Sequence, residues 1–153
     1  METAEAVASL LPKFCSAHHS LALTAALLHD AGKSDDYVMA PGQVNRLSDW
    51  GRLVSHKPTV TFWIGEIHRS LKNGLSHAML QSLLHAINAT KAPPELGLRK
   101  PMTPEAILLS LADLASGKGD LFARQSARDG GWGMPHPHLG EPGLYTVAGW
   151  EVD

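Results

Sequence analysis

The stretch S-L-A-L-T-A-A-L-L-H-D-A-G-K, residues 20–33, decides the fold of this chain. Alanine and leucine dominate the stretch, and both residues favour a helix. Apolar residues occupy nearly every side of that helix, so we expect it in the middle of a core, running from 20 to 31 and stopped by Gly32. His29 and Asp30 close this apolar segment. A buried aspartate is rare unless it is paired or binds a cation, so the pair is a candidate site.

Several other stretches have apolar residues at helical spacing, and two of them begin with a favourable N-cap: Ser48 and Thr103. Pro104 is suited to the first helical position after Thr103. The stretches predicted as helices are 3–14, 48–55, 60–71, 76–88 and 103–114. We expect the first to end early near Pro12 and the third to follow a break or kink at Pro58. Gly117 or Gly119 is expected to weaken the end of the last helix. Residues 34–47 and 90–101 are expected to be loops, and no alternating pattern predicts a sheet.

The composition fits a single globular domain and excludes some classes of function. The chain has 153 residues, 13 basic and 15 acidic, with a formal charge of −2. That balance excludes a strongly basic surface as the main device for binding nucleic acid. It is compatible with a metal site that handles phosphate, because the ion then supplies the positive charge.

The same composition predicts a cytoplasmic protein with no membrane segment. The only cysteine, Cys15, cannot form an internal disulfide, which fits a reducing compartment. The first residues are acidic where a signal peptide needs basic ones. No apolar run approaches the roughly 20 residues needed to span a bilayer.

Nine histidines in the chain favour a search for a metal site. Besides His29 and Asp30, three residues stand out: His56, His85 and Asp113. Asp113 is a carboxylate inside an otherwise apolar predicted helix, which again requires a partner or a cation.

Three segments carry a resemblance to a known family. A-A-L-L-H-D-A-G-K (25–33) looks like the signature of the HD-domain metal-dependent phosphohydrolase superfamily. R-L-S-D-W-G-R-L-V-S-H (46–56) resembles that family's D-E-G-R-L-L-G-H segment. P-M-T-P-E-A-I-L-L-S-L-A-D (101–113) resembles its P-x-T-P-E-A-x-x-L-x-x-A-D stretch. The nearest branch is the HD domain of OB-fold-linked 3′–5′ exoribonucleases, and relaxase-associated HD domains are also similar. The resemblance covers roughly residues 20–146.

The resemblance implies a fold and a site. The fold is an all-α, HD-domain-like bundle of about five or six helices, a single domain over 1–153 whose last part, about 129–153, is an irregular arm. The metal ligands are then His29, Asp30, His56 and Asp113, converging within roughly 5 Å of one point on a divalent ion. Manganese, magnesium, iron, nickel and zinc all remain open.

The activity implied is hydrolysis of a nucleotide or of a nucleic-acid phosphodiester. Asp30 and Lys33 are the candidate catalytic residues: Asp30 holds the ion and orients water, and Lys33 meets a substrate phosphate. Arg52 and His85 are further candidates for substrate binding. Each has a plainer alternative. Asp113 pairs with an arginine such as Arg52, His85 is a hydrogen-bonded core histidine, and Lys33 is a solvated charge at a helix end.

Two departures from the family pattern make the site incomplete. The upstream helix, 3–14, lacks the histidine that the branch has there. L-L-H-A-I-N-A-T-K (83–91) stands where the branch has L-L-H-x-I-L-S-H-H-G, so the expected further ligands are replaced. Two alternatives to an enzyme follow. The chain is a non-catalytic HD-fold domain that binds a nucleotide or a partner protein, or it is a fragment of a larger nuclease or conjugation protein.

Overall fold

Helices make up most of the structure. The computed structural model describes residues 2–38, 46–89, 98–127, 129–139 and 143–148. The elements in chain order are α1 (Glu2–Leu10), a 3-10 turn η1 (Leu11–Lys13), α2 (His19–Leu28), α3 (Lys33–Asp36), β1 (Tyr37–Val38), β2 (Arg46–Leu47), α4 (Asp49–Leu53), α5 (His56–Ser70), α6 (His77–Asn88), α7 (Pro104–Gln125), β3 (Gly131–Trp132) and β4 (Tyr145–Thr146). The predicted all-α fold is confirmed.

The chain forms two compact units, Met1–Asp113 and Leu114–Asp153, and the division falls inside α7. The sequence suggested one domain with an arm beginning near residue 129. All four predicted metal ligands belong to the first unit.

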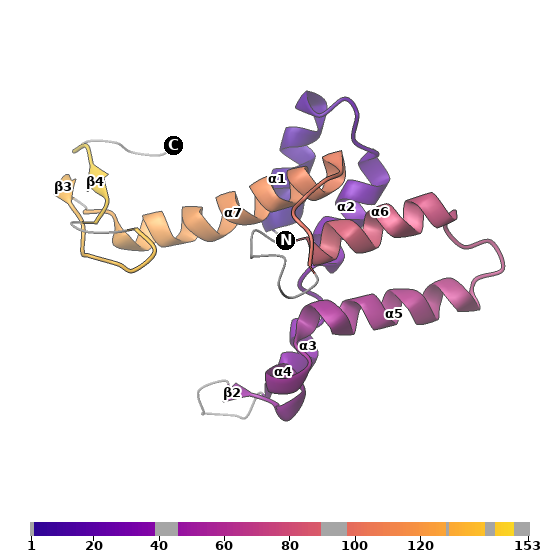
Figure 1. The fold of residues 1–153 in the computed structure, drawn as a ribbon. Coiled ribbons are helices and arrows are strands. Elements are labelled where there is room, and N and C mark those ends of the chain that lie inside the picture. The colour runs from indigo at the N-terminus through magenta and orange to yellow at the C-terminus, as the bar shows by residue number, and fades with distance from the viewer. Residues whose placement is uncertain (1, 39–45, 90–97, 128, 140–142, 149–153) are drawn as a thin grey trace. The chain divides into compact units, whose positions relative to one another are not determined.

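The first unit is built around α2. This helix packs against α1 and α6, and α6 also packs against α5 (Figure 1). Alanine at the contact positions of α2 lets neighbouring backbones approach closely, and Ala22 and Ala25 are fully buried. The prediction that this segment lies inside the core is correct for the face formed by Leu21, Ala22, Ala25 and Ala26, whereas Leu27 on another face is 64% exposed. The buried apolar residues of the core are Val7, Leu11, Ala17, Leu21, Ala22, Ala25, Ala26, Val60, Ile64, Leu83, Ala86, Ile87, Ala106, Leu108, Leu109 and Ala112.

The end of α2 differs from the prediction. The helix stops at Leu28 instead of Ala31, and His29 follows as its C-cap. His29 and Asp30 therefore lie in the turn after the helix. Gly32 is the N-cap of the short helix α3, in a region predicted as loop from residue 34 onward. The loop prediction was wrong for residues 34–36, because a helix of four residues is too short to show a periodic apolar pattern. Residues 39–45 of the predicted loop lie outside the described part of the chain.

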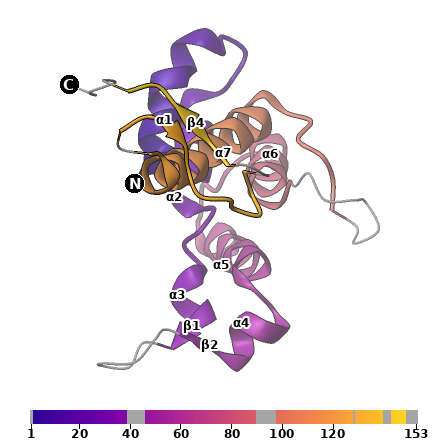
Figure 2. The same cartoon turned by 90° about the vertical axis from the view of Figure 1, so that its left-hand side faces the viewer.

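Helices α3 and α4 lie beside each other near the start of α5 (Figure 2). Ser48 caps α4 as predicted, since its hydroxyl accepts a hydrogen bond from the Gly51 N–H at 2.9 Å. Pro58 does not break the next helix, because α5 begins at His56 and places Pro58 in its first turn. A proline is tolerated in that turn, where the N–H has no partner within the helix.

The helices α6 and α7 begin where the sequence predicts. Ser76 Oγ accepts from the Met79 N–H at 3.3 Å, and Thr103 Oγ1 accepts from the Ala106 N–H at 3.2 Å. Helix α7 continues past Gly117 and Gly119 to Gln125, so neither glycine ends it. Of the predicted loop 90–101, residues 90–97 lie outside the described part of the chain.

Two very short antiparallel ladders were not predicted. β1 pairs with β2, and β3 pairs with β4. Each strand has two residues, which is too short to give a visible alternation in the sequence. In the second unit, Trp132 and Tyr145 pack edge to face across β3 and β4, with ring centroids 5.1 Å apart. Among the described helices, none combines the length and apolar character that a membrane crossing requires.

Candidate metal centre

The imidazole of His29 is held in one orientation by the helix that precedes it. Its Nδ1 lies 2.7 Å from the Ala26 carbonyl oxygen. A carbonyl only accepts, so Nδ1 carries a proton. In the neutral ring Nε2 then has a free lone pair. Nε2 is buried and has no hydrogen-bond partner in the described structure. An unpartnered buried nitrogen is costly, which makes it a point where a cation would be stabilised.

Two carboxylates face that nitrogen. Asp30 Oδ2 and Asp113 Oδ1 each lie 3.5 Å from His29 Nε2. The Asp113 carboxylate raises the pKa of His29 above its ordinary value, although burial of the ring opposes this. In turn His29 holds the pKa of Asp113 below its ordinary value. The structure thus gives Asp113 a histidine partner at this centre, in place of the Arg52 pairing that was the alternative.

The second imidazole, His56, is also oriented through its Nδ1, in this case by a carboxylate. It is the first residue of α5, and its Nδ1 lies 3.1 Å from Asp36 Oδ2. Asp36 is buried, with 4% of its surface exposed. The carboxylate accepts from Nδ1, so Nε2 again carries the lone pair in the neutral ring. This nitrogen lies 3.5 Å from Asp30 Oδ1. The Asp30 carboxylate therefore stands between the two rings.

Three nitrogen–oxygen distances link the four predicted ligands: His29 with Asp30, His29 with Asp113, and His56 with Asp30. Each of the three nitrogen–oxygen pairs is separated by 3.5 Å, beyond the usual 2.7–3.2 Å of an N–H···O hydrogen bond. Two ligands about 2.1 Å from one ion, at a tetrahedral angle, lie about 3.4 Å apart. The three separations are close to that value, which is also the distance of a loose histidine–carboxylate ion pair. Among the described residues, however, no three His, Cys, Asp or Glu side chains already form a complete metal-holding group.

Lys33 supplies a positive charge to this centre. Its Nζ lies 2.6 Å from Asp30 Oδ2, one turn along the chain from the carboxylate. The ammonium is paired with Oδ2, the oxygen that also lies 3.5 Å from His29 Nε2, whereas Oδ1 faces His56. Lys33 is thus more than a solvated charge at a helix end, since it is an ion-pair partner of a predicted ligand.

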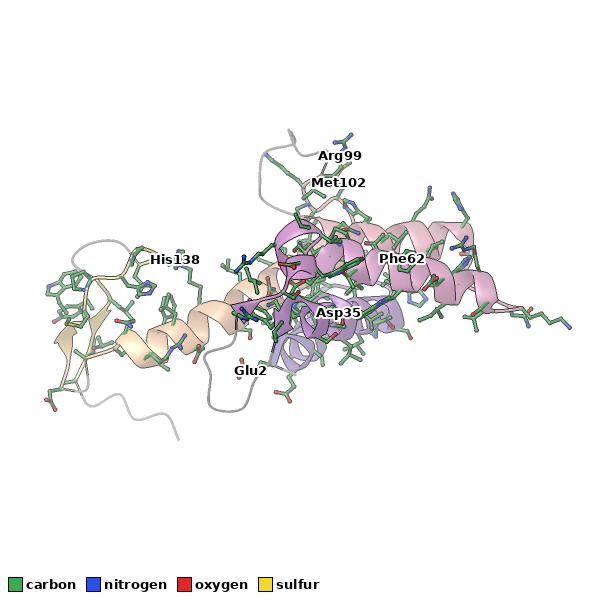
Figure 3. All side chains as sticks on the ribbon, turned by 90° about the horizontal axis from the view of Figure 1, so that it is seen from below. Glu2, Asp35, Phe62, Arg99, Met102 and His138 are labelled. Carbon is green, nitrogen blue, oxygen red and sulfur yellow. The ribbon has the colours of Figure 1, made fainter. Side chains whose placement is uncertain are left out.

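Arg52 and His85 have other surroundings. Arg52 lies on α4 and lines a shallow depression of about 260 Å³ together with Arg46 and Asp49. His85 lies on α6, and its Nε2 accepts a hydrogen bond from the Met102 N–H at 2.9 Å. Met102 is in the segment between α6 and α7 (Figure 3). His85 is thus hydrogen-bonded, as its plainer alternative predicted, and within the described part of the chain neither side chain forms a hydrogen bond or ion pair with the four ligands.

Sequence reasoning missed two residues that shape the centre: Gly32 and Asp36. A Cβ on Gly32 would lie 2.5 Å from the His56 carbonyl oxygen, so only glycine allows α3 to approach the start of α5 this closely. Asp36 gave a weak signal, as an acidic residue six positions after Asp30.

Comparisons with protein-family models, with curated proteins and with solved structures find no match for this chain. The site geometry therefore carries the functional argument.

Proposed function

We propose that this chain is an HD-type, metal-dependent phosphohydrolase that binds one divalent ion through His29, Asp30, His56 and Asp113. The proposed substrate is a phosphoester of a nucleotide or of a nucleic acid. One observation carries the proposal. Both imidazoles donate through Nδ1 and turn an Nε2 lone pair toward carboxylate oxygens 3.5 Å away. A divalent cation between these lone pairs would satisfy both the imidazoles and the carboxylates.

The groups behind the two rings support this. Metal-binding histidines usually donate the other ring N–H to a carboxylate or a backbone carbonyl, which fixes the tautomer. His56 has such a carboxylate in Asp36, and His29 has such a carbonyl in Ala26. Two histidines and two carboxylates are a mixed donor set suited to manganese, iron, nickel or zinc, and less suited to magnesium.

A bound divalent ion would lower the pKa of water and polarise a phosphoryl oxygen. The chain's own residues then have separate tasks. Asp30, between the rings, orients the attacking water through a carboxylate oxygen. Asp113 is the most exposed of the four, with 61% of its side chain accessible, so it lies where a substrate enters. Lys33, 47% exposed, can move from Asp30 to a substrate phosphate.

The test is metal content followed by turnover. Purified protein should retain about one divalent ion per chain, measured by inductively coupled plasma mass spectrometry. His29→Ala and Asp113→Ala should lose it, while His77→Ala, an exposed histidine on α6, should not. Asp36→Asn should weaken binding about tenfold or more, because the carboxylate that orients His56 is gone.

Hydrolysis of bis(p-nitrophenyl) phosphate by the loaded protein, absent in His29→Ala, completes the test. Retention of the ion by His29→Ala would refute the site. An ion held by the four residues without turnover under any of the candidate metals would favour the non-catalytic alternative.

A further inference from the structure

A pocket of about 450 Å³ lies against the first half of α7, and the proposed reaction leaves it without a task. Its described lining residues are Lys100, Pro101, Ile107, Ser110 and Leu111. All of them belong to the first unit, as do the four proposed ligands. The volume lies within the range of about 300–1,000 Å³ that small-molecule sites usually have.

The pocket combines apolar walls with two polar groups. Pro101, Ile107 and Leu111 supply the apolar surface. The Lys100 ammonium and the Ser110 hydroxyl are the polar groups, and neither takes part in a hydrogen bond or ion pair among the described residues. An ammonium only donates, whereas a hydroxyl both donates and accepts. Apolar walls with a few polar groups are typical of a site for a ring system that has a polar edge.

The wall that precedes α7 is fixed by the two residues that follow Pro101. The Met102 N–H donates to His85 Nε2 on α6 at 2.9 Å. Thr103 Oγ1 then accepts from the Ala106 N–H on α7 at 3.2 Å. The wall is thus attached to both helices, so a ligand would enter the pocket without having to order it first, which lowers the cost of binding.

One edge of the pocket lies beside the proposed metal centre. Ser110 precedes Asp113, the most exposed of the four proposed ligands, by one turn of α7. Side chains three residues apart on a helix are neighbours, with Cβ atoms about 5–6 Å apart. The ribose of a nucleotide holds its base and its phosphoryl group apart by a span of this order. A single nucleotide could therefore occupy the pocket and reach the centre.

The lining favours a single nucleotide over a nucleic-acid strand. Proteins that bind single strands use a positively charged groove with aromatic side chains on which successive bases stack. The described lining has one lysine and no aromatic residue, and the chain has a formal charge of −2. A single base, by contrast, can lie between apolar side chains and be recognised through hydrogen bonds to its edge.

We propose that this pocket receives the base of a nucleotide whose phosphoryl group lies at the metal centre. Ile107 and Leu111 contact the ring of the base, and Lys100 and Ser110 form hydrogen bonds with its edge. The inference rests on the proposed function and narrows the substrate to a nucleoside monophosphate.

The experiment compares four Mn²⁺-loaded proteins: wild type, Ile107→Ser, Leu111→Ser and Ile67→Ser. Ile67 is an exposed isoleucine on α5, so its variant is the matched control for Ile107→Ser. Metal content is measured first, and circular dichroism checks that each variant folds. Isothermal titration calorimetry then measures binding of two ligands, the phosphonate analogues of adenosine monophosphate and of ribose 5-phosphate. In both analogues carbon replaces the ester oxygen, which prevents hydrolysis, and only the first carries a base.

We expect the wild type to bind the adenosine analogue about tenfold more tightly than the ribose analogue, because only the adenosine analogue buries a base. Ile107→Ser and Leu111→Ser should each keep the ion and bind the adenosine analogue about fivefold more weakly, since part of the apolar contact is lost. Their affinity for the ribose analogue should not change. Ile67→Ser should bind both analogues like the wild type.

Three results would overturn the inference and leave the proposed metal site standing. The first is equal affinity of the metal-loaded wild type for the two analogues. The second is an equal loss of affinity for both analogues in Ile107→Ser and Leu111→Ser. The third is a loss in Ile67→Ser as large as that in Ile107→Ser.

Absence of any ion in the wild type would instead end the proposed function. Binding of adenosine, which has no phosphate, then tests the pocket alone. Adenosine binding that Ile107→Ser weakens and Ile67→Ser does not would support a base in the pocket, and no adenosine binding would overturn the inference as well.

Discussion

At the scale of single residues, Ser55 has the most unusual backbone beside the centre. Its φ of 71° and ψ of 164° lie in a region that is almost confined to glycine. Ser55 directly precedes His56, and its Oγ lies 3.4 Å from the His56 Nδ1. The segment that 46–56 resembles, D-E-G-R-L-L-G-H, has glycine at this position.

Ser55→Gly should therefore stabilise the protein, because glycine adopts this conformation without steric conflict. We expect a gain of about 1 kcal/mol, or about 2–4 °C in the midpoint of thermal unfolding. Ser55→Ala is the matched variant, since it keeps the Cβ and loses only the hydroxyl. Differential scanning calorimetry on both variants separates relief of the backbone strain from loss of the hydroxyl group. An equal shift of the unfolding midpoint in both variants would contradict the argument from strain.

The four residues of the proposed site could be singled out from the sequence, but the residues that orient their side chains could not. His29, Asp30, His56 and Asp113 stand in segments with a recognisable order. Asp36 acts through a contact with a residue twenty positions away, which depends on how α3 meets α5. A contact of that kind is set by packing, and one sequence carries no trace of it.

At the scale of elements, the buried carboxylate of Glu105 joins three helices. It lies on α7 with 6% of its surface exposed. Its oxygens accept from the His18 N–H at 2.7 Å, at the start of α2, and from the Ser82 hydroxyl on α6 at 3.2 Å. Burial alone would raise the pKa of Glu105, but these hydrogen bonds outweigh it and hold the pKa below the ordinary 4.5.

A lowered folded-state pKa means that Glu105 stabilises the fold above its unfolded pKa, and that this contribution is lost as the pH falls through the folded value. Glu105→Gln should cost about 1–3 kcal/mol at pH 7, because the hydrogen bonds to a charged acceptor are weakened. The difference in the free energy of unfolding between wild type and Glu105→Gln should become smaller as the pH falls below about 4.5.

Chemical unfolding at pH 7 and at acid pH measures that gap. Glu66→Gln, an exposed glutamate on α5, is the control and should change stability little at either pH. A gap that stays constant down to acid pH would show that the Glu105 charge adds nothing to the three-helix contact.

Helix starts with a side-chain cap were well predicted, whereas the start of α5 at His56 was placed four residues late. Ser48, Ser76 and Thr103 each mark a start through a side-chain hydrogen bond to the next turn. The end of α2 was placed three residues late, because Ala31 and Gly32 continue an apolar pattern that the chain leaves at His29. The signal for turning there is tertiary, since Gly32 must lie against the backbone of His56.

At the scale of the whole molecule, the two units differ in what stabilises them. The core cluster of described residues begins at Val7 and ends at Ala112, so it lies entirely within the first unit. The contacts of the second unit are small by comparison, such as the ring pair of Trp132 and Tyr145. The first unit also contains all four proposed ligands.

Removal of residues 126–153 should therefore leave the first unit folded, with the proposed metal site intact. The shortened chain keeps the whole of α7, and its unfolding midpoint should shift by no more than about 2–4 °C. The segment Leu114–Asp153 made alone should show no cooperative unfolding, since a piece this short without disulfides buries too little apolar surface. Thermal unfolding followed by circular dichroism measures the midpoint and the cooperativity of both pieces, and metal analysis measures the bound ion. An unfolded 1–125 chain, or one without the ion that the full chain holds, would show that the second unit is part of the metal-binding fold.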